Sequence, residues 1–114
     1  ANAASMGTAC AVVYLRGGGV DAAERAIQNV AADTAGIICD GAKSGCALKL
    51  ATGLRSAFLA ADLAMDGICA SGFEGIVHQD AGETIRGIGR LCKEGMCSAD
   101  PVILRMMLEK QAAL

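Results

Sequence analysis

The sequence predicts an all-α fold, a compact bundle of about five helices in a single domain that spans residues 1–114. The chain's 114 residues are a usual length for one domain. Hydrophobic residues make up 54% of the chain and aromatic residues only 3%, so small side chains dominate the apolar part and favour closely packed helices. No stretch alternates apolar and polar residues in the manner of a half-buried strand.

Three glycines separate the first two expected helices. The segment from Asn2 to Arg16 consists mostly of small and apolar residues, and the run of residues 17–19 would end it. Asp21 followed by Glu24 is similar to a capping box and predicts the start of the second helix. One face of that helix is expected to be apolar: Ile27, Val30, Ala31, Thr34 and Ile38.

Three further helices are expected along the rest of the chain. Ser44 can cap a long third helix, Asp80 with Glu83 starts a fourth that ends near Gly95, and Asp100 before Pro101 starts the last, over residues 102–110. The residues expected to face inward are Ala47, Leu50, Leu54, Ala57, Phe58, Ala61 and Met65 on the third helix, Ile85, Ile88, Leu91 and Cys92 on the fourth, and Ile103, Leu104, Met107 and Leu108 on the last.

Charge and hydropathy exclude two classes of partner. The formal net charge of −2 provides no cationic surface for phosphate backbones, so no nucleic acid is expected as a partner. The longest apolar stretch near the start, Ala9 to Leu15, is far shorter than the roughly 20 residues of a membrane span, so no membrane partner is expected either. The chain lacks an initiating Met, and we expect it to be a piece of a longer protein.

The six cysteines are expected to be thiols or metal ligands rather than disulfides. Disulfide-rich miniproteins are usually chains that cannot bury a sufficient core, whereas this chain is rich in aliphatic residues. We therefore expect a reducing, cytoplasmic location.

The most informative cysteines are Cys39 and Cys46, which bracket six residues between two expected helices. A helix N-terminus after the loop would favour thiolates, which bind metals well, and Lys43 adds a nearby positive charge. Gly41 and Gly45 would let the backbone approach a bulky group. The spacing matches neither a structural zinc knuckle nor a ferredoxin, so spacing alone leaves open that both are ordinary core cysteines.

The identity of the surrounding residues adds a second argument that Cys39 and Cys46 bind metal. The stretches 12–18, 36–43, 45–49 and 84–91, which read VVYLRGG, GIICDGAK, GCALK and TIRGIGRL, together resemble the L-cysteine desulfidase family, relatives of the iron–sulfur L-serine dehydratase alpha chain. The resemblance implies a [4Fe–4S] cluster held by three cysteines, with Cys39 and Cys46 as two of them. The third family ligand would lie upstream of residue 1, and Cys10 is a possible substitute. This piece would then be the cluster-bearing C-terminal part, without catalytic residues of its own.

The resemblance also implies the reaction. An open iron would polarise the bond from Cβ to the leaving group, while a base on the N-terminal catalytic part removes the α-proton. L-Cysteine would give pyruvate, ammonia and sulfide. L-Serine is the alternative small-molecule substrate, and a non-catalytic helical module is the alternative from another class. The sequence leaves open whether the protein forms a homo-oligomer.

Other candidate residues carry weaker signals. His78, the only histidine, is expected to be a surface or capping residue, because no orienting partner for a base is evident. Cys92 is expected in the core and Cys97 at the surface, although together they could bind metal. Cys69 is expected to be an ordinary loop thiol.

Overall fold

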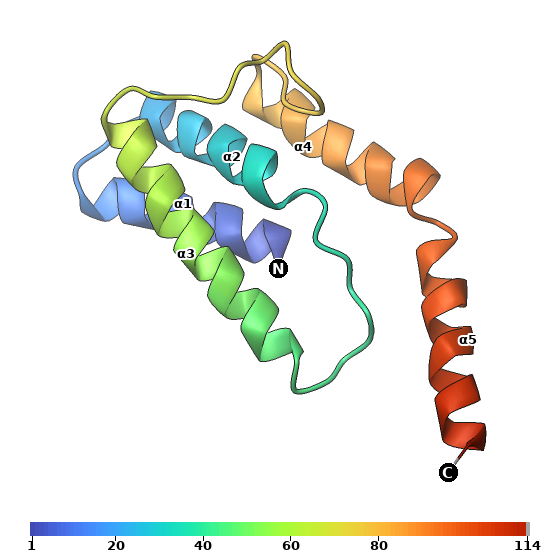
Figure 1. Cartoon of the computed structure of the whole chain (residues 1–114). Coiled ribbons are helices and arrows are strands. Elements are labelled where there is room, and N and C mark those ends of the chain that lie inside the picture. The colour runs from blue at the N-terminus through green and yellow to red at the C-terminus, as the bar shows by residue number, and fades with distance from the viewer. Residues whose placement is uncertain (114) are drawn as a thin grey trace.

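The computed structural model describes residues 1–113 and confirms the all-α fold with five helices. They are α1 (Asn2–Leu15), α2 (Val20–Thr34), α3 (Cys46–Met65), α4 (Ala81–Arg90), which continues into a π-helical turn η1 (Leu91–Gly95), and α5 (Ala99–Ala112). Helices α1, α2 and α3 pack on one another, α4 lies against α2, and α5 lies to one side (Figure 1).

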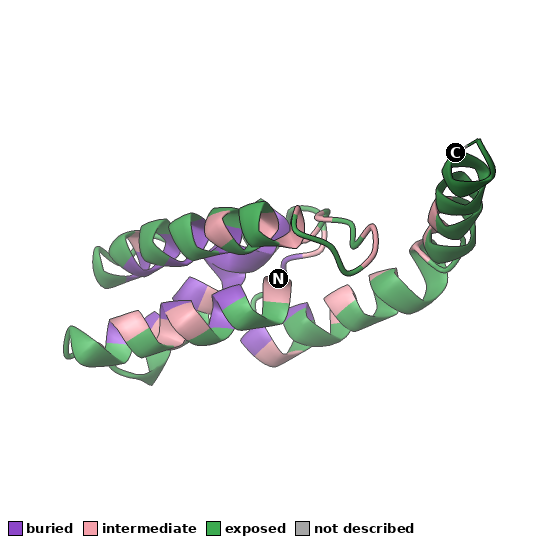
Figure 2. Ribbon diagram, turned by 90° about the horizontal axis from the view of Figure 1, so that it is seen from below, coloured by how far each residue is buried: buried purple, intermediate pink, exposed green. Residues whose placement is uncertain are grey.

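The core between α1, α2 and α3 is built from small residues. Figure 2 shows the buried positions on the facing sides of these helices. The fully buried apolar residues are Ala9, Val13, Ala26, Val30, Ala31, Ala57, Ala61 and Ala64. Because these side chains are short, the three helix axes can approach closely. In such a tightly packed core, a substitution that changes the side-chain volume by even one methylene group disturbs the packing.

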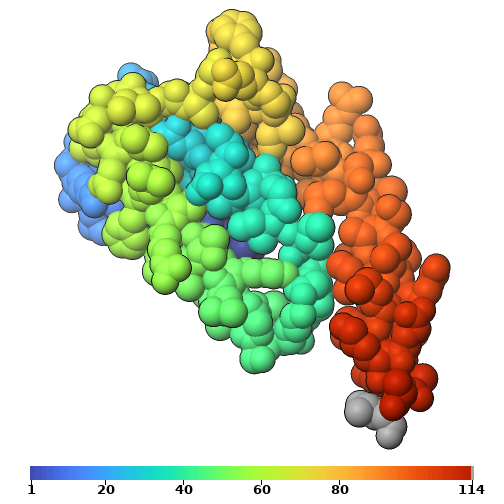
Figure 3. Space-filling view, in the orientation of Figure 1, coloured from blue at the N-terminus to red at the C-terminus, as the bar shows by residue number. Residues whose placement is uncertain are grey.

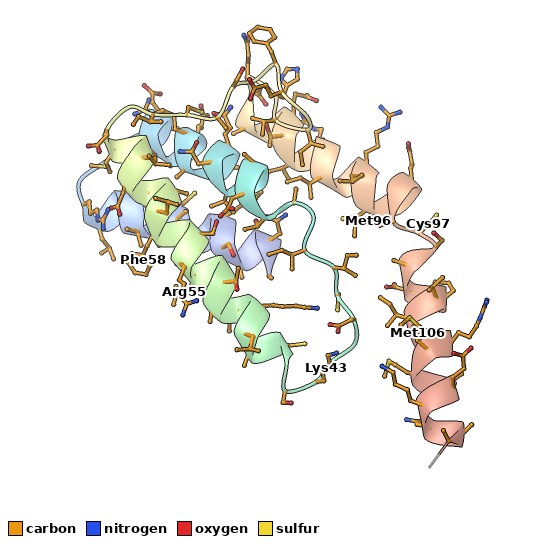
Figure 4. All side chains as sticks on the ribbon, viewed as in Figure 1. Lys43, Arg55, Phe58, Met96, Cys97 and Met106 are labelled. Carbon is orange, nitrogen blue, oxygen red and sulfur yellow. The ribbon has the colours of Figure 1, made fainter. Side chains whose placement is uncertain are left out.

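The expected inward stripe of α3 is therefore mostly wrong. Ala57 and Ala61 are buried, but Leu50, Leu54 and Phe58 are each about half exposed, and Ala47 and Met65 are exposed too. The alanines of α3 take the face toward α1 and α2, so the larger residues lie at its flanks. Figure 4 shows Phe58 on the outer side of α3.

Two polar side chains on α2 attach the loop between α3 and α4. Asn29 donates to Ile68 O at 3.0 Å and accepts from Ala70 N at 2.8 Å. Gln28 donates to Gln79 O at 2.8 Å and accepts from the Cys69 thiol at 2.6 Å. Buried polar groups of this kind need partners, so the loop follows a defined path over α2.

Of the expected helix starts, those of α1 at Asn2 and of α4 after Asp80 are confirmed. Asp80 Oδ1 accepts from Glu83 N at 2.8 Å, as an N-cap does. The other starts are wrong by one or two residues: the N-caps are Gly19, Gly45 and Ser98, none of them with a side-chain cap, instead of Asp21, Ser44 and Asp100. Backbone turns with glycine or serine start these helices without the carboxylate and hydroxyl contacts that the sequence suggests.

Helix α5 differs most from expectation. No helix of residues 1–113 packs against it, and it has no buried residue. Leu104, Met107 and Leu108, expected inside, are exposed, and Ile103 is half-buried. On α4 and η1, Ile88 packs against the core, but Ile85 and Cys92 are exposed. The apolar spacing of these segments predicts a covered face, and the described residues do not cover it.

Asn29 gives a test of this fold. Asn29→Ala leaves Ile68 O and Ala70 N without a partner, so we expect the free energy of unfolding to fall by about 2 kcal/mol. Asp33→Ala, on an exposed position of the same helix, is the control and should change it by less than about 0.5 kcal/mol. Urea denaturation followed by circular dichroism measures both, and equal effects would contradict the role of Asn29.

Candidate metal centre

Cys39 and Cys46 lie on the segment that joins α2 to α3. Helix α2 ends at Thr34, so the expectation that it extends to Ile38 is wrong. Ile37 N donates to Thr34 O at 3.1 Å and closes a turn at Gly36, after which residues 37–41 are irregular. Cys39 therefore lies within the loop rather than at a helix end, and Cys46 is the first residue of α3.

Both cysteines line one cavity of about 440 Å³. Its other walls come from the start of α1, the loop and the first turn of α3: Ala1, Asn2, Ile37, Ile38, Ala47, Lys49 and Leu50. Cys39 is exposed, Cys46 is partly exposed, and neither belongs to the hydrophobic core. The interpretation of both as ordinary core cysteines is therefore wrong.

Cys46 is the first residue of the 20-residue helix α3. The first backbone N–H groups of this helix donate to oxygens of the preceding turn, that of Cys46 to Lys43 O at 2.9 Å. The Cys46 thiol donates to Gly41 O at 3.2 Å, across the loop. Gly41 has a φ of +95°, a region that favours glycine, and a Cβ added there would lie 3.5 Å from Met107 Sδ.

Asp40 holds two lysines beside the cysteines. Lys43 and Lys49 each donate to one oxygen of the Asp40 carboxylate. These hydrogen bonds, that from Lys43 first, hold the pKa of Asp40 well below its usual range, and Asp40 in turn raises the pKa of Lys43. Lys49 also donates to Ile38 O at 2.6 Å. The loop is thus attached to the first turn of α3 by charged groups.

A second cavity lies between the loop and α5. Cys39 and Gly41 line it on one side, and Asp100, Ile103, Leu104 and Met107 line it on the other. The space-filling view shows the loop beside α5 (Figure 3). Cys39 thus lines both cavities.

The remaining candidates do not join this pair. Cys10 lies on α1, where its thiol donates to Ala23 O at 3.8 Å, and burial raises its pKa. Burial also raises the pKa of Cys69. Cys92 and Cys97 are both exposed, so the expectation of Cys92 in the core is wrong. Among residues 1–113, no group of three Cys, His, Asp or Glu side chains is placed to hold a metal ion.

His78 is at the surface, as expected. Its Nδ1 accepts from Asp80 N at 3.2 Å, next to the cap of α4.

Three residues that line the cavity were not expected there: Lys49, Ala1 and Asn2. Lys49 follows Cys46 by three positions, which places both on one face of a helix, and this spacing could have revealed it. Ala1 and Asn2 could not have been found, because only the packing of α1 against α3 brings them to the cavity.

None of the helices in the described part of the chain combines the length and apolar character that crossing a bilayer requires.

Comparison with known proteins gives the family. The family model described as serine dehydratase alpha chain matches residues 1–105. A UPF0597 protein of Latilactobacillus sakei is 50% identical over 109 residues, which are 96% of this chain and 25% of that protein. UPF0597 proteins of Clostridium perfringens and Oleidesulfovibrio alaskensis are 44% and 42% identical, over 96% and 97% of this chain and 26% of each relative. No solved structure matches the chain.

The chain thus spans about a quarter of the length of these curated relatives. The match to the family model covers nearly all of the chain, including Cys39, Cys46 and the whole cavity that they line. The chain belongs to the serine dehydratase alpha chain family.

Proposed function

We propose that this chain is the cluster-bearing part of an amino-acid lyase that converts L-cysteine and water into pyruvate, ammonia and sulfide. Cys39 and Cys46 would supply two thiolates to a [4Fe–4S] cluster. The observation that carries the proposal is the single cavity that both cysteines line at the N-terminus of α3. Thiolates are the protein ligands of such clusters.

The residues around the cavity fit such a group in part. Two thiols, apolar walls and a helix N-terminus suit a sulfur-rich, negatively charged cluster. Two thiols are one fewer than the three ligands expected. Ala1 and Asn2 form one wall, so a residue joined to the amino side of Ala1 would lie near the cavity, where a third ligand is needed.

The chemistry divides between this chain and the rest of the enzyme. When bound, the cluster would offer an iron that acts as a Lewis acid toward the leaving group of the substrate. Cys39 and Cys46 would hold it, and the apolar side chains of Ile37, Ile38 and Leu50 would limit water around it. The base that removes the α-proton would come from the N-terminal catalytic part, as the partner of this chain.

Loss of the α-proton and of the β-thiol as hydrosulfide, together one hydrogen sulfide, converts L-cysteine to aminoacrylate, which tautomerises to an imine. Water then hydrolyses the imine to pyruvate and ammonia. L-Serine, losing water instead of hydrogen sulfide, is the second candidate substrate, and the description of the matching family favours it.

The ligand assignment is tested by removing each thiol. The protein expressed from its complete gene and reconstituted without oxygen should hold about four iron atoms and four sulfides and absorb near 400 nm. Cys39→Ala and Cys46→Ala should each lose most of the iron. Cys97→Ala, which removes an exposed thiol outside the cavity, is the control and should keep it. A colourless, iron-free wild-type protein, or iron unaffected by both variants, would overturn the proposal.

The proposal that catalysis needs the rest of the enzyme is tested with the chain alone. The isolated 114-residue chain should produce no pyruvate from L-cysteine or L-serine, because the proposal assigns the base and the third ligand to the rest of the enzyme. Pyruvate is measured with lactate dehydrogenase. Turnover that depends on Cys39 would show that the chain contains its own base.

The substrate is tested with the complete reconstituted protein. L-Cysteine should give equal amounts of sulfide and pyruvate, with a higher kcat/KM than L-serine. The reverse order of kcat/KM would make L-serine the substrate and leave the ligand assignment in place.

A further inference from the structure

Lys49 contacts both neighbours of Cys39. Its Nζ donates to the backbone oxygen of Ile38 at 2.6 Å and to the carboxylate of Asp40. One side chain therefore holds the residue before Cys39 and the residue after it. Within residues 1–113, the amide N–H groups of residues 38–41 donate no backbone hydrogen bond, so side-chain contacts keep this part of the loop in place.

The same lysine belongs to the first turn of α3. It follows Cys46 by three residues, lies on the same face of the helix and lines the same cavity. Its side chain is 32% exposed, so water screens it less than a lysine at the open surface. Lys49 thus connects both neighbours of Cys39 directly to the turn that carries Cys46, whereas the Cys46 thiol bonds the loop further along, at Gly41 O.

Lys43 offers a contrast within the same loop. It donates to the other oxygen of Asp40, but it does so from within the loop, three residues away, and it is 52% exposed. Among the described residues, its ammonium group bonds neither Ile38 nor α3, although its backbone oxygen accepts from Cys46 N at 2.9 Å. Figure 4 shows Lys43 on the part of the loop that leads into α3. An ion pair within the loop cannot fix the loop's position relative to α3.

We propose that Lys49 is a positioning residue that holds Cys39 opposite Cys46 by binding Ile38 O and the Asp40 carboxylate from the first turn of α3. The purpose of this placement, which is to preform a pair of metal ligands, rests on the proposed function. The placement of Cys39 by Lys49 is independent of that function. A preformed site costs less to occupy than one that must order its ligands when the group binds.

The test compares matched variants of the 114-residue chain without metal. Lys49→Met keeps an unbranched apolar side chain and removes the ammonium group, and Lys43→Met makes the same change in the contrasting lysine. Lys49→Arg keeps a charged donor. Backbone ¹⁵N relaxation gives the order parameters of Cys39 and Asp40, and circular dichroism melting confirms that each variant is folded.

In the wild-type chain the order parameters of residues 39 and 40 should be near 0.8, and in Lys49→Met they should fall below about 0.6. Lys43→Met should stay within about 0.1 of the wild-type values, and Lys49→Arg should restore at least half of the loss. Wild-type values already below 0.6, no change in Lys49→Met, or an equal fall in Lys43→Met would overturn the inference.

A second measurement separates this inference from the proposed function. In the reconstituted protein from the complete gene, Lys49→Met should lose iron to a chelator about three to ten times faster than the wild type, and Lys43→Met at the wild-type rate. If the wild-type protein holds no iron, the proposed function fails, and the order parameters still decide whether Lys49 positions Cys39. If the order parameters behave as expected but both variants lose iron equally, the placement by Lys49 has no part in metal retention, and the inference is overturned in its functional part.

Discussion

The close approach of α1, α2 and α3 is the constraint on which the candidate site depends. Side chains no larger than alanine or valine fill the fully buried apolar positions between these helices. Gly53 is an extreme case, because a Cβ added there would lie 2.3 Å from Ser5 Oγ on α1. This contact fixes the start of α1 beside the first half of α3, and so places Ala1 and Asn2 on the wall of the cysteine cavity. Larger core residues would move α1 away and open that wall.

The candidate site itself depends on polar and charged contacts rather than on hydrophobic packing. The thiol of Cys46 reaches Gly41 O, and Lys49 reaches Ile38 O, so two bonds from the first turn of α3 hold the loop on both sides of Cys39. A loop held in this way can keep its thiols accessible, which a core position would not allow. This arrangement agrees with a role in binding a group that enters after folding. It also explains why hydrophobic patterning alone could not reveal how the loop is placed.

Much of the fold could be predicted from the sequence, but its contacts could not. The three glycines after α1 and the Asp80 cap of α4 are local signals, and local signals decide where helices exist. Which face of α3 is buried depends on its neighbours, and a pattern of leucines at helical spacing hides the alanines that pack. The apolar residues of α5 predict a buried face that the described residues do not bury. The two cysteines could be chosen from residue identity and Lys49 from its spacing to Cys46, whereas the contacts of Lys49 needed the geometry, because they span 9 and 11 residues.

The most direct measurement of the central claim is nuclear magnetic resonance of the reconstituted protein from the complete gene, labelled with ¹³C at the cysteine Cβ atoms. A paramagnetic cluster shifts the Cβ signals of its own ligands far outside the usual range. Of the six cysteines of this chain, only Cys39 and Cys46 should show such shifts, while Cys10, Cys69, Cys92 and Cys97 keep ordinary positions. An ordinary signal for either Cys39 or Cys46, or a shifted one for Cys92 or Cys97, would contradict the account.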